Sequence, residues 1–247
     1  MRRIPLCLIA LTLSVSVALS IALLDMPLHA REAPARVNAT THFENTLDAR
    51  TRTLCNNAVS TVLARVRATF PWFTPPTFSF HKDAAAGTPA SPWAGGYYAH
   101  PTRTVYIQHV PLLIEQGRLL ATIHHECVHA ALALAGPSRL PLWLEEGAAI
   151  FFSEQTIGPA PAGARRARTL ADLERTLHIL TRQNDEAAWL EIRLAHTQAR
   201  HIVSSLAERQ GTAHFVNFLR VLKNGTHFTQ ALASYYALTP EDLEKWL

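Results

Sequence analysis

LLATIHHECVHAALAL, at residues 119–134, is an apolar run without proline or glycine, as expected for a buried helix. Within it, His125, Glu126 and His129 form the pattern HExxH. Residues four apart share one face of a helix, so both imidazoles can reach one metal ion while Glu126 lies beside them. This spacing is typical of zinc hydrolases. It predicts a helix from about residue 117 to residue 134 that carries a metal site.

A second apolar helix follows and contains two neighbouring carboxylates. Pro141 opens it, and the sequence LWLEEGAAI places Glu145 and Glu146 directly before Gly147. A catalytic zinc ion takes three protein ligands and keeps one position open, so the two histidines need one more donor. Carboxylates inside an apolar helix are costly when unpaired, and a metal ion offsets that cost. We therefore expect Glu145 or Glu146 to supply the third ligand.

These two segments resemble the gluzincins, the HExxH metallopeptidases with a downstream glutamate ligand, and specifically the bacterial peptidase MA-like domains. The family pattern Trp-Leu-x-Glu-Gly-x-Ala falls on Trp143, Leu144, Glu146, Gly147 and Ala149. The resemblance implies one zinc ion per chain, held by His125, His129 and Glu146, with Glu126 as general base. Glu145 then occupies the variable position, as a solvated carboxylate or as one that supports a ligand.

The resemblance covers residues 43–247 and implies an exported zinc peptidase that acts on a peptide or protein substrate. Upstream of the zinc helix, the segments 93–96 and 104–107 look like the family's hairpin, whose edge strand pairs with extended substrate. The alternative is a non-catalytic envelope protein that retains a structural zinc site. An intact Glu126 favours the enzyme, because a purely structural site needs no base.

One position departs from the family pattern. The helical tail of these domains carries an Ala-Tyr pair whose tyrosine stabilises the tetrahedral intermediate, and this chain has Ala195-His196 there. A histidine can also donate a hydrogen bond to an oxyanion. We therefore assign the stabilisation of the tetrahedral intermediate to His196 as a catalytic residue, with Tyr97, Tyr98 and His201 as alternatives.

The remaining pattern predicts an α+β fold. Apolar residues at spacings of three or four predict a helix over residues 43–70, and the alternation in TFSFH predicts a strand at 77–81. The segments 95–98 and 104–107 flank a turn and predict a hairpin. We expect a small antiparallel sheet packed on the helix pair that carries the metal site.

The C-terminal part is expected to be entirely helical. A helix is predicted at about 142–154, and after the loop at 158–164 every segment has a helical pattern. Thr169 with Asp172 has the spacing of a capping box, and Thr239-Pro240 opens the last short helix. Strands early in the chain followed by helices argue for α+β rather than alternating α/β.

Residues 1–30 are predicted to direct export. Arg2 and Arg3 precede an apolar run over residues 4–24, which has the organisation of a signal peptide with its best cleavage position after Ala30. The run is also just long enough to tether the chain to the inner membrane if it is not removed. Residues 31–42 are polar and aperiodic, and we expect a flexible leader there. The predicted location is periplasmic or extracellular.

Charge argues against a nucleic-acid partner. The 247 residues include 23 Lys and Arg against 19 Asp and Glu, and the chain has no motif of a DNA- or RNA-binding module. Cys55 and Cys127 remain after residue 30, and an exported protein enters an oxidising compartment. We predict that these cysteines form a disulfide between the first long helix and the back of the zinc helix.

Overall fold

In a computed structural model, the described residues are 39–84, 94–133, 140–157, 166–180 and 186–247. All of them belong to one unit of the chain, Val37–Leu247. The predicted signal or anchor at 1–30, most of the expected leader and Trp93 lie outside the described residues. Within the described ranges, no helix has the length and apolarity that a membrane crossing requires.

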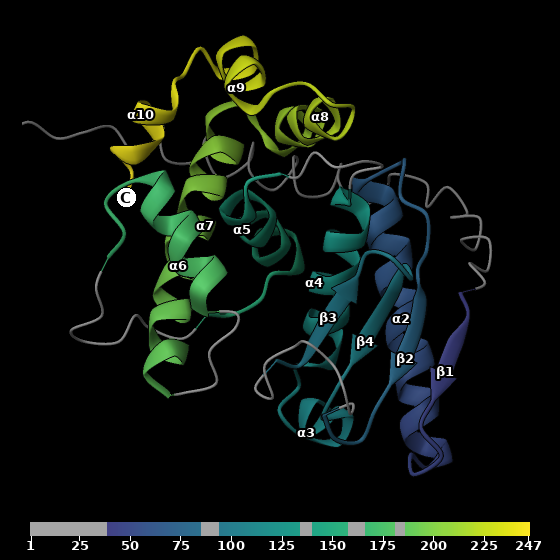
Figure 1. Cartoon of the computed structure of the whole chain (residues 1–247). Helices are drawn as coiled ribbons and strands as arrows, with labels where there is room; N and C mark the ends of the chain where they lie inside the picture. Colours follow the sequence, from purple (N-terminus) through teal and green to yellow (C-terminus); the bar gives the residue numbers. More distant parts are fainter. Residues whose placement is uncertain (1–38, 85–93, 134–139, 158–165, 181–185) are drawn as a thin grey trace, which may run out of the picture. The chain divides into compact units, whose positions relative to one another are not determined.

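The described elements confirm the predicted α+β class, with strands confined to the first half of the chain (Figure 1). The strands are β1 (Thr41–Phe43), β2 (Thr77–Phe80), β3 (Gly96–Ala99) and β4 (Thr104–Ile107). The helices are α2 (Ala49–Thr69), α3 (Val110–Glu115), α4 (Leu119–Leu132), α5 (Leu142–Ser153), α6 (Leu170–Leu180), α7 (Glu186–Gln210), α8 (Thr212–Lys223), α9 (Phe228–Tyr236) and α10 (Pro240–Glu244).

The four strands form a mixed sheet in the order β1-β2-β4-β3. The predicted hairpin is confirmed, because β3 and β4 pair antiparallel. The prediction of an antiparallel sheet is otherwise wrong, because β2 runs parallel to both β1 and β4. Parallel neighbours require a crossover connection, and α2 supplies it between β1 and β2.

Strand β1 corrects two predictions at the start of the domain. Thr41–Phe43 pairs with β2, so the last residues of the expected leader and the first residue of the expected helix are strand. The helix begins instead at Ala49, where the side chain of Asp48 accepts a hydrogen bond from the backbone N–H of Thr51 at 2.7 Å. Aspartate at this position satisfies an otherwise unpaired N–H group and opposes helix formation further upstream.

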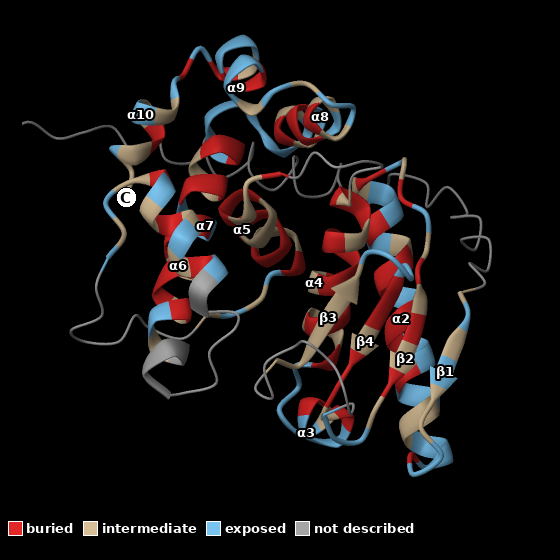
Figure 2. Ribbon diagram, viewed as in Figure 1, coloured by how far each residue is buried: buried red, intermediate tan, exposed pale blue. Residues whose placement is uncertain are grey.

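One face of the sheet is buried against helices α2 and α4 (Figure 2). The inward side chains of the two central strands are fully buried, namely Phe78, Phe80, Val105 and Ile107. Because side chains alternate along a strand, this face accounts for the TFSF and TVYI patterns. The sheet therefore packs on one side of α4, and α5 packs on another side of α4.

Helix α5 lies between α4 and α7 and contacts both. A Cβ atom on Gly147 would lie 2.5 Å from the backbone oxygen of Ala199 in α7, so only glycine permits this approach. Two hydrogen bonds to the Glu174 carboxylate of α6 also fix the start of α5, because the backbone N–H of Leu142 donates to it at 2.9 Å and that of Trp143 at 3.2 Å.

Helices α2 and α4 pack together, but the predicted disulfide between them is wrong in this structure. Cys55 and Cys127 are both free and buried. Burial raises the pKa of the Cys55 thiol to about 12, and burial also raises the pKa of the Cys127 thiol. Neutral thiols of this kind behave as small apolar side chains in a core.

The predicted helix starts near the C-terminus are confirmed. The side-chain oxygen of Thr169 accepts from the N–H of Asp172 at 3.0 Å, and Thr239 forms a complete capping box with Asp242. Helix α3 was not expected, because its six residues are too few to show a helical period.

Candidate metal site

Helix α4 places two imidazoles one turn apart on the same face. The Nε2 atoms of His125 and His129 lie 3.0 Å apart, and the rings are nearly perpendicular, with an interplanar angle of 68°. This is the consequence of the i, i+4 spacing that the sequence predicted. Two nitrogens at such a distance are close enough to share one ion.

Helix α5 brings a carboxylate to the same place. The oxygens of Glu146 lie 3.5 Å from His125 Nε2 and 3.7 Å from His129 Nε2. One ligand atom from each of the three residues falls within 4.8 Å of the others, and this group could hold a metal ion. The structure thus brings together the three residues predicted as ligands.

The site concentrates negative charge around its imidazoles. Burial acts to raise the pKa of Glu146, but His129 and the neighbouring histidines outweigh it and hold this pKa well below its usual range. Burial acts to lower the pKa of His129, but Glu146 and Glu145 raise it to about 10. Buried carboxylates that stabilise positive charge this strongly also favour a bound cation, and mixed nitrogen and oxygen donors suit a divalent transition metal.

Glu126 is buried beside the metal group and beneath the edge strand of the sheet. It is 6% exposed, and burial raises its pKa above the usual range although His125 and His129 act against this shift. A Cβ atom on Gly96 would lie 3.1 Å from the Cγ of Glu126. The backbone of β3 therefore approaches the side chain predicted as the general base.

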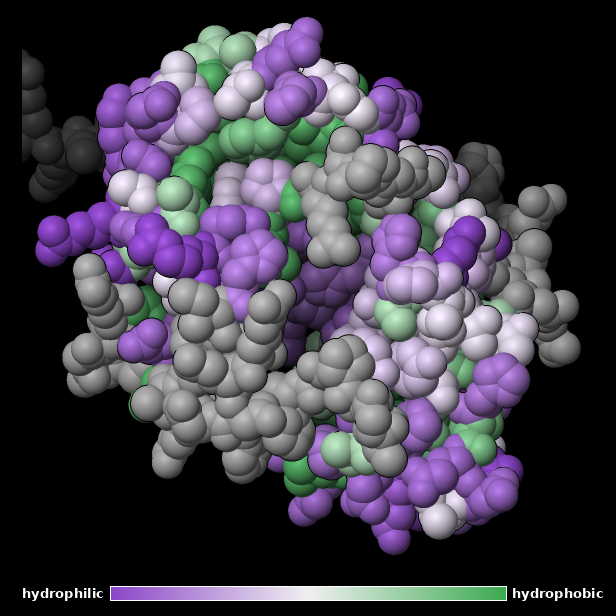
Figure 3. Space-filling view, in the orientation of Figure 1, coloured by the Kyte–Doolittle hydropathy of each residue, from purple (hydrophilic) through white to green (hydrophobic). Residues whose placement is uncertain are grey.

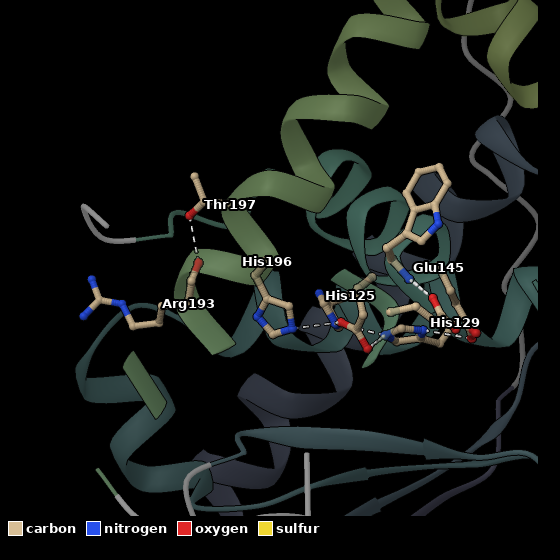
Figure 4. A network of polar contacts seen from close by, with 9 residues as sticks. His125, His129, Glu145, Arg193, His196 and Thr197 are labelled. Carbon is tan, nitrogen blue, oxygen red and sulfur yellow. Dashed lines mark hydrogen bonds and ion pairs between the residues drawn. The ribbon is translucent and has the colours of Figure 1, made fainter. Parts of the chain in front are cut away.

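Glu145 lies behind His129 and outside the metal group. Its Oε1 is 3.1 Å from the Nδ1 of His129 (Figure 4), whereas the group that could hold an ion contains Glu146 instead. The two carboxylates of α5 thus reach His129 at different ring nitrogens. Of the two uses considered for Glu145, the structure favours a supporting contact.

Helix α7 brings His196 to the site, where its Nε2 lies 3.4 Å from Glu146 Oε2 (Figure 4). Burial lowers the pKa of His196, and Glu146 opposes this shift only in part. The close approach of α5 and α7 at Gly147 makes the contact reachable. A position chosen from the sequence pattern of the tail is therefore adjacent to the predicted ligands.

The alternatives to His196 are placed differently. His201 is exposed on α7, and the ring of Tyr97 stacks on that of Tyr106 with centroids 4.8 Å apart. Tyr98 packs against the core, and burial raises its pKa, although Arg103 acts in the opposite direction.

A recess with a hydrophilic floor opens on the face shown in Figure 3, between α6 and α7 on one side and β3 on the other. Two of the bordering elements reach the metal group, because α7 carries His196 and β3 lies against Glu126.

Sequence reasoning missed the contacts that hold the C-terminal end of α4. Lys223 of α8 donates a hydrogen bond to the carbonyl of Ala133 at the end of α4, where a cation also complements the helix dipole. Trp72 donates to the carbonyl of Ala131 at 3.1 Å. These partners are 90 and 59 residues apart in sequence, so no local pattern could have indicated them.

Comparison of the chain with models of protein families, with curated proteins and with solved structures finds no match. Any functional conclusion therefore depends on the site and on the sequence motifs within it.

Proposed function

We propose that this protein is an exported zinc-dependent peptidase. The observation that supports the proposal most directly is that His125, His129 and Glu146 converge from two helices, with Glu126 buried next to them. The likeness of both helix motifs to the peptidase MA-like gluzincins supports the same activity. Three protein ligands leave one position of a tetrahedral zinc ion for a catalytic water.

A bound zinc ion would lower the pKa of its water and polarise the scissile carbonyl. Glu126 takes the proton from the attacking water and passes it to the leaving amine, because it is the one carboxylate of the site that neither joins the metal group nor contacts a ligand imidazole through Nδ1. His196 donates a hydrogen bond to the oxygen that becomes negatively charged.

Strand β3 offers a place for the substrate. It is the last strand in the sheet order, and its Gly96 lies against Glu126. An extended peptide that adds to this edge would run past the general base with its backbone aligned. The proposed substrate is therefore an extended peptide or protein segment, in the periplasm or outside the cell, and the proposal includes no nucleic-acid partner.

Zinc content and peptide cleavage by the purified protein test this proposal. We expect one zinc ion per chain, cleavage of members of a peptide library, loss of cleavage with a chelator and recovery when zinc is restored. His129→Ala and Glu146→Ala should lose most of the metal, whereas Glu145→Ala should still reach one zinc per chain at saturating zinc. A zinc-loaded protein that cleaves no peptide would favour the non-catalytic alternative.

A further inference from the structure

We propose that Glu145 is a positioning residue that orients His129 for metal binding and raises the affinity of the site. This inference rests on the proposed metal site. The contact that carries it joins Glu145 Oε1 to His129 Nδ1 over 3.1 Å (Figure 4). Glu145 does not belong to the group that could hold the ion, so its effect must pass through the imidazole.

The contact selects one form of the ring. An ionised carboxylate can only accept a hydrogen bond, so the Nδ1 of His129 carries a proton in this contact, and the proton that leaves when a metal ion binds is the one on Nε2. The lone pair of a neutral ring then lies on Nε2. That nitrogen is the one 3.0 Å from the Nε2 of His125 and 3.7 Å from Glu146. The hydrogen bond therefore holds the tautomer that a metal ion needs.

The two imidazoles differ in whether a hydrogen bond holds their Nδ1 atom. The Nδ1 of His125 is buried and has no hydrogen-bond partner within the part of the chain that the structure describes. Among these residues, His129 is thus the ligand ring with an anchored second nitrogen. Loss of Glu145 would leave both rings free of such an anchor.

Two adjacent residues of α5 divide the work at the site, because Glu146 belongs to the metal group and Glu145 orients His129. Successive residues of a helix project about 100° apart, so Glu146 reaches the Nε2 side of the imidazoles while Glu145 reaches the Nδ1 side of His129. The Glu145 side chain is 27% exposed, so the contact is largely shielded from water. A shielded, charge-assisted hydrogen bond is stronger than one on the surface.

Metal affinity of the full-length protein tests the inference. Zinc affinity is measured by competition with a chelator of known affinity, and the Co²⁺-substituted protein gives a visible spectrum that reports ligand geometry. We expect Glu145→Ala to weaken zinc binding by about 10- to 100-fold and to alter the cobalt spectrum. Glu145→Gln should fall between parent and alanine variant, because its amide oxygen still accepts from Nδ1 without the charge.

Glu154→Gln is the matched control, because it removes an exposed carboxylate from the end of the same helix. Its affinity and spectrum should equal those of the parent. Parental affinity and spectrum in both Glu145 variants would overturn the inference, and Glu145→Gln alone decides if the alanine variant does not fold. A parent protein that binds no zinc would contradict the proposed function instead.

Discussion

Glu126 is buried at a place where a carboxylate is disfavoured unless neighbouring groups stabilise its charge. Desolvation raises its pKa, and the two imidazoles of α4 act in the opposite direction. A base in such surroundings is poised to take a proton more readily than a fully solvated carboxylate. This environment suits the role of general base that we propose for Glu126 from its position in HExxH.

Replacement of Glu126 by glutamine tests this role. Glutamine keeps the shape but cannot accept a proton from water, so we expect turnover to fall by at least about 100-fold. Zinc content should stay at the parental level, because Glu126 is not among the residues that could hold the ion. Turnover and metal content are measured on the same sample. A Glu126→Gln protein with parental turnover would exclude the residue as the base.

His196 is predicted to donate to the developing oxyanion. His196→Ala should lower turnover by about 100-fold or more with zinc content intact, as expected for a lost oxyanion donor. His196→Tyr should recover part of the activity, because the resembling family has tyrosine at this position. Full turnover in the alanine variant would remove His196 from the mechanism and direct attention to Tyr98, which packs inward.

The sequence alone could predict which side chains meet when they lie on one helix, but not when they come from two different elements. The spacing of His125 and His129 is a property of one helix, so HExxH was sufficient to pair them. The contact between Glu145 and His129 spans 16 residues and two helices. Neighbouring glutamates in an apolar helix indicated one ligand, and the family resemblance selected Glu146, but the contact of Glu145 with His129 is a consequence of the packing of α5 on α4.

Among the elements, α5 shows most clearly why a glycine follows the two glutamates. The helix approaches α7 so closely that a Cβ on Gly147 would meet the backbone oxygen of Ala199. Backbone atoms cannot rotate away as side chains can, so extra volume here must separate the helices. The same approach brings His196 to Glu146, which links the packing of two helices to the chemistry of the site.

Gly147→Ala should therefore affect both stability and activity. We expect the free energy of unfolding to fall by about 1–3 kcal/mol, a typical cost of overpacking, and turnover to fall because His196 moves away from the site. Denaturant unfolding and peptide cleavage measure the two effects. Gly95→Ala is the control, because its Cβ would meet side-chain methyl groups of Leu113 and Thr122 at 3.1 and 3.3 Å rather than backbone atoms. Side chains can move aside, so this variant should lose less stability than Gly147→Ala. Equal stability in the parent and Gly147→Ala would contradict the packing argument.

Element boundaries were predictable where local chemistry determines them. Thr169 and Thr239 cap their helices with neighbours three residues away, so the sequence contains the whole interaction. The start of α5 is different, because Pro141 makes no side-chain cap and the carboxylate that accepts from Leu142 comes from Glu174, 32 residues later. Strand β1 was missed for a similar reason, since three residues show no period and the partner strand β2 lies more than 30 residues later.

At the scale of the whole described unit, α4 packs against the sheet, α2 and α5. This central position explains why a helix that carries two histidines of the group that could hold a metal ion also contributes the buried residues Ile123, Cys127 and Val128. The α+β class followed from the order of strands and helices. The parallel pairing followed from tertiary contacts between β1, β2 and β4, which single-strand patterns do not encode.

The same central position makes stability depend on pH through His124, which is 7% exposed on α4. Burial, with a smaller contribution from Arg65, lowers the pKa of His124 from 6.5 to about 4. Between these values the unfolded chain binds a proton that the folded chain does not. The free energy of unfolding must therefore decrease as the pH falls from about 6.5 to about 4. A shift of this size corresponds to about 3 kcal/mol.

His124→Leu should remove this contribution, because leucine does not titrate. Denaturant unfolding of chelator-treated parent and variant at pH 7 and pH 4 measures it, and chelation removes the separate effect of proton competition for metal ligands. The parent should lose about 3 kcal/mol more than the variant over this interval. Thr122→Val is the control, because it changes another buried polar side chain of α4 without a titratable group and should keep the parental dependence. If His124→Leu and the parent lose the same free energy between pH 7 and pH 4, the buried neutral imidazole is not a source of acid instability.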